Sequence, residues 1–369
     1  MNLENLKSDE LAIFSLRELY CKYGFSQYKM SKFEEYDLYV RNKDFLVSDN
    51  IITFTDTDGK LMALKPDVTL SIIKNSDCGE LCVEKVYYNE NVYRVSKGTH
   101  SYKEIMQTGL ECIGAIDDYN IYEVIMLAAK SLETISEDFV LDISHLGIVS
   151  EIIDTLGVSE NARKRILAAI GEKNIHTLSS ICAEEGVDDS ALKILVRAYG
   201  APEKVISALK DIPCLSDSTS LSQLEKINNM LKSNSFYKNV RLDFSVINNM
   251  NYYNGFVFKG FINGISSGIL SGGQYDSLMQ KMKKPCGAVG FAVYLDMLEL
   301  LNREEIEYDV DAVILYDDAC DTKALADAVA MLTANGSSVC AQKSIPKKMK
   351  YKQLLKLNER GVEIIENNA

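Results

Sequence analysis

The spacing of apolar residues changes several times along the chain, and each change predicts a change of secondary structure. Near the start, four apolar residues follow the helical spacing i, i+3, i+4 and i+7: Leu16, Leu19, Tyr20 and Tyr23. Gly24 then ends the predicted helix. Residues 44–57 and 60–65 alternate polar and apolar side chains on either side of Asp58 and Gly59, which predicts a β-hairpin.

The following segments predict one short helix, two long strands and a long helix. The sequence L-K-P-D ends the hairpin strand and begins a helix, with Asp67 or Thr69 in reach of the free amides of its first turn. Alternating side chains predict strands over 84–95 and 104–113. Helical apolar spacing over 119–135 predicts a helix that lies across the sheet formed by these strands.

The middle of the chain has a different pattern, in which short helical stretches are separated by Gly, Pro and Ser and no strand-like alternation occurs. Strand patterns return in three later segments: 239–245, 252–261 and 265–271. We therefore predict a main domain formed by residues 1–146 and 238–303, a helical insertion at 147–237, and a last unit at 308–369.

The last unit is predicted to contain strand, helix, strand, helix and strand in that order, which indicates a small α/β domain. The predicted elements are a strand over 309–316, a helix over 322–335, a strand over 337–342, a helix over 345–360 and a strand over 362–366. Four lysines gather at the start of the second predicted helix: Lys347, Lys348, Lys350 and Lys352. Such a run forms either a solvated helix face or an RNA contact.

Composition and charge narrow the classes of function. The 369 residues are 47% hydrophobic and 25% charged, as in a soluble globular protein of two or three domains. No run of about 18 uncharged apolar residues occurs, and the start lacks an apolar signal core, so we expect a cytoplasmic protein. The net charge of −13 argues against a large nucleic-acid footprint, because a protein that neutralises phosphates needs a basic face.

The nine cysteines are scattered along the chain without the spacing of a disulfide framework. Cys78 and Cys82 are four residues apart, but no second pair or histidine cluster lies near them in sequence to complete a zinc site. We therefore expect reduced, mostly buried thiols, no metal and no cofactor.

Four segments combine polar, aromatic and glycine residues in a way that suits a small ligand. They read L-K-P-D-V-T from Leu64, N-V-Y-R-V-S from Asn91, M-Q-T-G-L-E from Met106 and S-G-G-Q-Y-D from Ser271. Gln107 and Glu111 lie four apart on one predicted strand, so their side chains emerge on the same face. A carboxylate beside a hydroxyl at Asp67 and Thr69 suits an ammonium ion, although Asp67 would equally serve as a helix cap.

Together with N-N-M-N-Y-Y-N-G from Asn248, these segments resemble the histidyl-tRNA synthetase family. The resemblance implies seven histidine-binding residues: Asp67, Thr69, Arg94, Gln107, Glu111, Tyr253 and Tyr275. In it, Asp67 and Thr69 hold the amino group, Arg94 faces carboxylate or phosphate, and Tyr253 faces the imidazole ring. Gly272 and Gly273 fit a place where the backbone approaches the ligand closely. The alternative is that the tyrosines are half-buried sheet residues.

Three positions depart from the family pattern in the same direction, because family arginines fall on Asn248, Gln274 and Met297. Adenylate formation places negative charge on phosphate oxygens, and loss of one preorganised donor costs roughly 3 to 4 kcal/mol of barrier. None of the three replacements carries a charge. The sequence therefore predicts a protein that binds the amino acid without activating it.

Within that family, the chain resembles the paralogues that act as regulatory subunits of ATP phosphoribosyltransferase. This resemblance implies an α+β fold: a class II synthetase-like antiparallel sheet flanked by helices, a helical insertion, and a truncated anticodon-binding-like C-terminal domain. It implies a homodimer within a hetero-oligomer that contains the short catalytic subunit of ATP phosphoribosyltransferase. It also implies a role in the first step of histidine biosynthesis, with histidine as the feedback effector.

Two functions of other classes stay open at this point. A divergent histidyl-tRNA synthetase would activate histidine with ATP and bind tRNA, which the missing arginines and the acidic charge disfavour. A stand-alone amino-acid-binding or scaffold protein would need no transferase partner. Detection of histidine-dependent pyrophosphate exchange, or of the catalytic subunit as a partner, distinguishes these functions.

Overall fold

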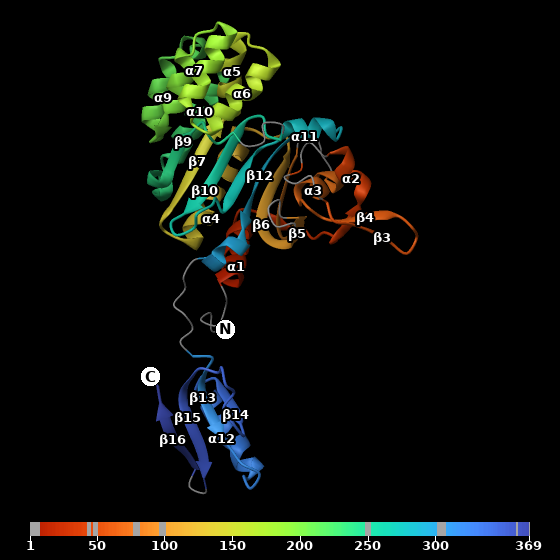
Figure 1. Ribbon diagram of the computed structural model, residues 1–369, viewed down its shortest axis with the longest axis vertical. Helices are drawn as coiled ribbons and strands as arrows, with labels where there is room; N and C mark the ends of the chain where they lie inside the picture. Colours follow the sequence, from red (N-terminus) through yellow and green to blue (C-terminus); the bar gives the residue numbers. More distant parts are fainter. Residues whose placement is uncertain are drawn as a thin grey trace. The chain divides into compact units, whose positions relative to one another are not determined.

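The computed structural model describes residues 8–42, 46, 51–76, 82–95, 101–247, 252–300, 308–358 and 361–368 (Figure 1). The chain forms two compact units, Met1–Leu301 and Asn302–Ala369, which we describe separately. The finer division of the first unit into a main domain and a helical insertion stays a prediction.

A nine-stranded sheet forms the centre of the first unit, in the order β1-β5-β6-β12-β11-β10-β7-β9-β8. In that order the strands are Ser26–Gln27, Val83–Val95, Tyr102–Gly114, Gly287–Tyr294, Leu270–Gln274, Phe256–Ile262, Phe139–His145, Val240–Asp243 and Tyr199–Gly200. Neighbouring strands are antiparallel except in the pairs β1–β5 and β7–β9, which are parallel. The mainly antiparallel sheet expected from the sequence is therefore confirmed.

One face of this sheet packs against two helices, α1 (Ser8–Lys22) and α4 (Asp118–Ile135). Both were predicted from helical apolar spacing, and Asp117 begins α4 by accepting a hydrogen bond from the backbone N–H of Asn120. The Tyr20 hydroxyl of α1 and the Ser131 hydroxyl of α4 are hydrogen-bonded at 3.0 Å within the apolar core. This bond joins the two helices where neither hydroxyl reaches water.

The other face of the sheet packs against the N-terminal segment that follows β1. Because side chains alternate along a strand, Tyr87 of β5 packs in the core beneath α1, while Val86 and Tyr88 pack in a separate apolar cluster on the opposite face. That second cluster includes residues of three helices: α2 (Tyr36–Arg41), α3 (Thr69–Asn75) and α11 (Asp276–Lys281).

A three-stranded antiparallel sheet, in the order β2-β4-β3, belongs to the same N-terminal segment. Its strands are Phe33–Glu35, Leu61–Leu64 and Thr53–Thr55. The pairing of β3 with β4 confirms the predicted hairpin, and Gly59 supplies the positive φ of its turn. The first predicted hairpin strand was too long in its described part, because Leu46, Ile51 and Ile52 lie outside β3.

Helices occupy most of residues 146–239, as the middle of the sequence predicted (Figure 1). They are α5 (Leu146–Leu156), α6 (Glu160–Gly171), α7 (Ile175–Glu185), α8 (Ser190–Arg197), α9 (Pro202–Lys210), η3 (Pro213–Leu215), α10 (Thr219–Leu231) and η4 (Ser235–Asn239). Sequence analysis missed β8, which pairs with β9 for two residues. A strand of that length is too short to show an alternating pattern.

Two later strands begin further along the chain than predicted. β10 begins at Phe256 and not at Tyr252, because residues 252–255 turn before the sheet pairing starts. β11 likewise begins at Leu270, and it is followed by α11, β12 and the 3-10 helix η5 (Leu295–Leu300). The strands predicted at 84–95, 104–113 and 239–245 are confirmed as β5, β6 and β9.

The second unit contains one α-helix and four strands in the order β14-β13-β15-β16. These are β13 (Val310–Leu315), α12 (Thr322–Ala334), β14 (Val339–Gln342), β15 (Tyr351–Asn358) and β16 (Gly361–Asn367). The helix predicted at 345–360 is wrong, because β15 lies there, parallel to β13 and antiparallel to β16. Leu355 and Leu357 of β15 both pack with α12. Side chains two residues apart therefore face the core, as in a strand, although the apolar spacing of the sequence favours a helix. The four lysines consequently precede or begin a strand.

The cysteines differ from the expected set of reduced, mostly buried thiols. Cys286 is disulfide-bonded. Among the seven free cysteines in the described parts of the chain, only Cys112 and Cys182 are buried.

Within the same described residues, no helix is long and apolar enough to cross a membrane.

Replacing Tyr20 with Phe tests the bond between α1 and α4. The variant loses one buried hydroxyl bond, so we expect a loss of about 1 kcal/mol in the free energy of unfolding, measured by urea denaturation. Tyr102→Phe is the matched control, because the Tyr102 side chain is 76% exposed. Equal stability of the two variants would show that the bond contributes nothing.

Candidate functional site

All seven residues predicted to bind a ligand line one cavity of the first unit. Asp67 and Thr69 come from the start of α3, Arg94 from β5, Gln107 and Glu111 from β6, Tyr253 from the turn before β10, and Tyr275 from the end of β11. The cavity encloses about 520 Å³ of empty space, part of it open to solvent. Asp67 and Tyr275, more than 200 residues apart in sequence, thus line the same cavity.

The start of α3 is fixed by Asp67, whose Oδ1 accepts a hydrogen bond from the backbone N–H of Leu70 at 2.9 Å. The helix-cap alternative for Asp67 is therefore correct, and the same side chain also lines the cavity. Burial raises the pKa of Asp67, while its bond to the Leu70 amide and the nearby Arg94 guanidinium oppose the rise. The Arg94 Nε–H donates to the Pro66 carbonyl at 3.1 Å, which holds the guanidinium beside this helix start.

Glu111 lies at the centre of the polar groups in the cavity. The Thr69 hydroxyl donates to its Oε1 at 2.8 Å, and the Tyr275 hydroxyl donates to its Oε2. Burial raises the pKa of Glu111 to about 8, although both hydroxyl bonds act in the opposite direction. A cationic group beside Glu111 would lower this pKa and favour the carboxylate form.

Gln107 lies on the same strand face as Glu111 and is 3% exposed. Its Nε2 donor is buried without a hydrogen-bond partner. Such a donor costs about 1–3 kcal/mol if it stays unsatisfied, so a ligand with an acceptor at this point gains affinity.

Tyrosine rings form the apolar wall of the cavity. Tyr252 packs edge-on against Tyr253 at 4.6 Å between ring centroids, and tilted against Tyr275 at 5.6 Å. Burial raises the pKa of all three phenols, so they stay protonated and can donate hydrogen bonds. This wall suits a flat ligand ring that carries nitrogen atoms.

Gly272 and Gly273 pack closely against other parts of the protein, and their predicted approach to a ligand stays a prediction. A Cβ at Gly272 would lie 2.4 Å from the Phe291 Cβ, and a Cβ at Gly273 would lie 2.7 Å from a ring carbon of Tyr253. These glycines therefore allow close protein packing and position Tyr253. The glycine nearest a site carboxylate is Gly290, where a Cβ would lie 1.7 Å from the Glu111 Oε2.

Several lining residues were missed by sequence analysis, chiefly Tyr88, Tyr252, Gly290 and Tyr294. Tyr88 follows from strand alternation, because it shares a face of β5 with the predicted Arg94. Gly290 and Tyr294 share a face of β12, but none of the seven predicted residues lies on that strand. Tyr252 adjoins Tyr253 but gives no separate signal.

Two of the three positions that depart from the family pattern are described. The Gln274 Oε1 accepts from the Phe256 backbone N–H at 2.9 Å, so this buried amide holds β10 against β11. Met297 is half-buried against the apolar core, with its sulfur 3.6 Å from the Ser267 hydroxyl. Asn248 lies outside the described residues. Arg94 is the one cationic side chain among the described residues that line the cavity.

Comparison with known families identifies the family to which this fold belongs. The model of the histidyl-tRNA synthetase family matches residues 3–298. The chain belongs to the histidyl-tRNA synthetase family. Within this family, an ATP phosphoribosyltransferase regulatory subunit from Oceanobacillus iheyensis is 26% identical over 95% of this chain and 89% of the relative. One from Alkaliphilus metalliredigens is 27% identical over 77% of this chain and 74% of the relative.

Solved structures of histidyl-tRNA synthetase-like proteins share the fold. An ATP phosphoribosyltransferase regulatory subunit/histidyl-tRNA synthetase from Bacillus halodurans C has a TM-score of 0.73 and 24% identity, over 91% of this chain and 88% of that one. A histidyl-tRNA synthetase from Nostoc sp. PCC 7120 has a TM-score of 0.71 and 16% identity, over 95% and 87%. At these identities the likeness establishes the fold.

The raised pKa of Glu111 predicts how stability depends on pH. An acid whose folded pKa lies above its unfolded value stabilises the fold fully below the unfolded pKa and loses this effect as pH rises through the folded one. For Glu111 that window runs from 4.5 to about 8. Glu111→Gln removes the ionisation, so we expect its free energy of unfolding to fall less over this window than that of the parent chain.

Urea denaturation at a series of pH values measures this difference. Glu133→Gln is the matched control, because Glu133 is exposed on α4 and its replacement should leave the parent pH profile unchanged. Parallel profiles for Glu111→Gln and the parent chain would show that Glu111 ionises normally.

Proposed function

We propose that this chain is a non-catalytic regulatory subunit of ATP phosphoribosyltransferase, and that its cavity binds histidine as the effector. The observation that carries the proposal is the set of charges in the cavity: two carboxyl groups and one guanidinium among the described lining residues. This set matches a zwitterionic amino acid. It lacks the several cations that a reacting triphosphate requires.

Each part of histidine has a matching group in the cavity. The ammonium fits Asp67 and Thr69 at the start of α3, and the carboxylate fits Arg94. The imidazole ring fits between Tyr253 and Tyr275. The Tyr253 hydroxyl donates or accepts according to the ring tautomer, whereas the Tyr275 hydroxyl, which donates to Glu111, accepts from the ring. The buried Gln107 Nε2 then gains an acceptor from the ligand.

The names of the relatives support the regulatory role. The regulatory subunits from Oceanobacillus iheyensis and Alkaliphilus metalliredigens are similar to this chain over most of its length. The fold is also shared with a chain of the ATP phosphoribosyl transferase (HisG:HisZ) complex from Thermotoga maritima, with a TM-score of 0.63 and 20% identity over 78% of this chain and 97% of that one. We therefore propose a homodimer that assembles with the short catalytic subunit, acts in the first step of histidine biosynthesis, and mediates feedback inhibition.

A divergent histidyl-tRNA synthetase is the second candidate, because the family model covers most of the chain and the amino-acid-facing residues line one cavity. Gln274 and Met297 disfavour it, since both side chains make uncharged contacts within the protein. Histidine-dependent pyrophosphate exchange by the purified chain would support this candidate over the regulatory one.

Gln107→Ala tests histidine binding in the cavity. We expect calorimetry to show histidine binding to the parent chain and an affinity about tenfold lower for the variant, because one buried hydrogen bond to the ligand is lost. Gln280→Ala is the control, since Gln280 is exposed on α11 and should not affect affinity. Equal affinities of both variants would place histidine elsewhere.

Reconstitution with the short catalytic subunit tests the regulatory role. We expect phosphoribosyl transfer to ATP only when both chains are present, and histidine should reduce the rate. The Gln107→Ala variant should still support the reaction. It should need about ten times more histidine for half-inhibition, because inhibition follows from histidine binding and the variant binds histidine more weakly. A catalytic subunit whose rate is unaffected by this chain would contradict the proposal.

A further inference from the structure

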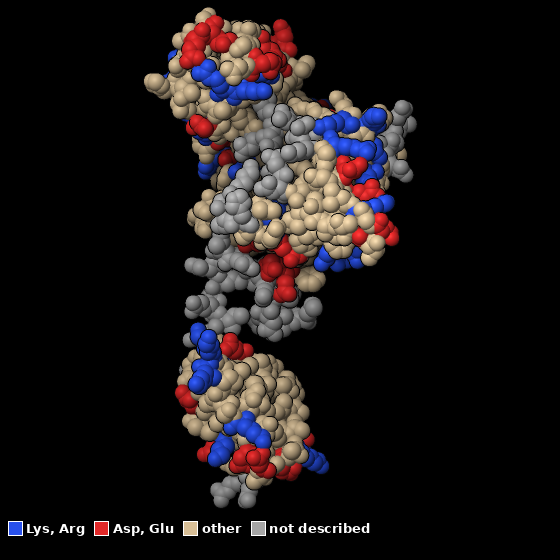
Figure 2. All heavy atoms as spheres, turned by 45° about the vertical axis from the view of Figure 1, so that its right-hand side comes forward, with Lys and Arg blue, Asp and Glu red and all other residues tan. Residues whose placement is uncertain are grey.

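A second concave feature lies away from the cavity, between α2, the end of α3 and the end of α11. We call it the basic groove, because four cationic side chains line it: Arg41, Lys74, Lys281 and Lys283. Figure 2 shows Lys and Arg side chains gathered on the face that carries α2 and α11. Two carboxylates, Glu35 and Asp37, also line the groove, so its described lining residues carry a net positive charge on a chain whose net charge is −13.

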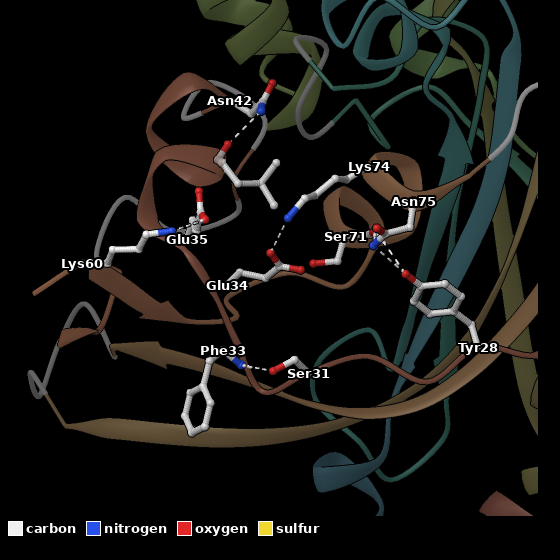
Figure 3. A network of polar contacts seen from close by, with 11 residues as sticks. Tyr28, Ser31, Phe33, Glu34, Glu35, Asn42, Lys60, Ser71, Lys74 and Asn75 are labelled. Carbon is white, nitrogen blue, oxygen red and sulfur yellow. Dashed lines mark hydrogen bonds and ion pairs between the residues drawn. The ribbon is translucent and has the colours of Figure 1, made fainter. Parts of the chain in front are cut away.

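Two of the groove's cations, Lys74 and Arg41, pair with neighbouring carboxylates. Lys74 reaches from α3 to Glu34 on β2 at 2.8 Å, and Lys60 reaches from the hairpin to Glu35 at 3.4 Å (Figure 3). Arg41 and Asp37 form an i, i+4 pair on α2, with both side chains more than 70% exposed. Such exposed pairs contribute little and exchange readily for a better partner.

Lys283 has a backbone conformation that favours glycine. Its φ is 59°, in the left-handed region, directly after α11 and its C-cap Met282. Glycine is the usual residue at this helix position, since a side chain there is strained. A lysine at this position therefore has a conformational cost, and its side chain lines the groove.

The remaining lining residues indicate what kind of anion fits. Leu38 and Met282 lie among the cations and are half-buried, so the groove offers apolar contact as well as charge. A small phosphate site would gather buried donors around one point, whereas these cations are exposed and come from three helices. A protein that binds nucleic acid typically makes about 6–10 phosphate contacts, more than these four cations supply.

We propose that the basic groove docks an acidic peptide segment of a partner protein, with glutamate or aspartate side chains on the four cations and an apolar side chain against Leu38 and Met282. The groove is separate from the cavity, so this proposal does not depend on histidine binding. Exposed charges at such a site set the rate of encounter and the choice of partner.

A labelled peptide of glutamate with leucine at every fourth position is the probe, and fluorescence anisotropy with the full chain measures its dissociation constant. We expect Lys281→Glu combined with Lys283→Glu to weaken binding at least about tenfold, because attraction becomes repulsion. The matched control combines Lys164→Glu and Lys204→Glu, which change the net charge equally on the exposed faces of α6 and α9. It should leave the dissociation constant within about twofold of the parent value.

Lys283→Gly separates binding from folding. Glycine fits the left-handed backbone, so the melting temperature should stay the same or rise while the peptide binds more weakly. Peptide binding that survives the double charge reversal would overturn the proposal, as would absence of binding at about 1 mM peptide. Equally strong competition by tripolyphosphate or by an oligouridine of similar charge would assign the groove to phosphates.

Discussion

The candidate site depends on the register of β6 between β5 and β12. Glu111 is paired with Val86 on one side and with Gly290 on the other. Only glycine fits opposite Glu111, because a Cβ at residue 290 would overlap its carboxylate. A slip of one residue would turn Gln107 and Glu111 into the apolar core and bring Leu110 into the cavity. The register of β6 therefore determines both which side chains pack in the apolar core and which polar side chains line the cavity.

Sequence patterns predicted most of the first unit because its elements are long and strongly periodic, as in α4, β5 and β6. They failed where tertiary contacts determine the secondary structure. The sequence of β15 has helical apolar spacing, but the segment forms a strand because it pairs with β13 and β16. β8 is too short to show an alternating pattern. The seven predicted site residues do line one cavity. They could be predicted together only from the family resemblance, because no local sequence pattern connects positions so far apart. The packing of Gly272 and Gly273 and the amide contact of Gln274 depend on neighbouring strands, so sequence alone could not show them.

Two buried carboxyl groups share a cavity that has a single guanidinium among its described lining residues. Burial raises the pKa of both Asp67 and Glu111, so the empty cavity favours protonated carboxyls and a bound ammonium favours ionised ones. An ammonium group bound between these carboxyl groups would lower the pKa of both. The helix that begins at this cavity, α3, also carries Lys74 at its far end, so cavity and basic groove share one short rigid element.

Both outermost strands of the large sheet, β1 and β8, are only two residues long. Very short edge strands leave few backbone groups for a foreign strand to pair with, which protects a sheet from growing by edge-to-edge association. At the β8 edge, Tyr199 and Gly200 come from between two helices, so the helical region itself closes the sheet there. A foreign strand that approaches β1 or β8 itself would consequently find only two residues to pair with.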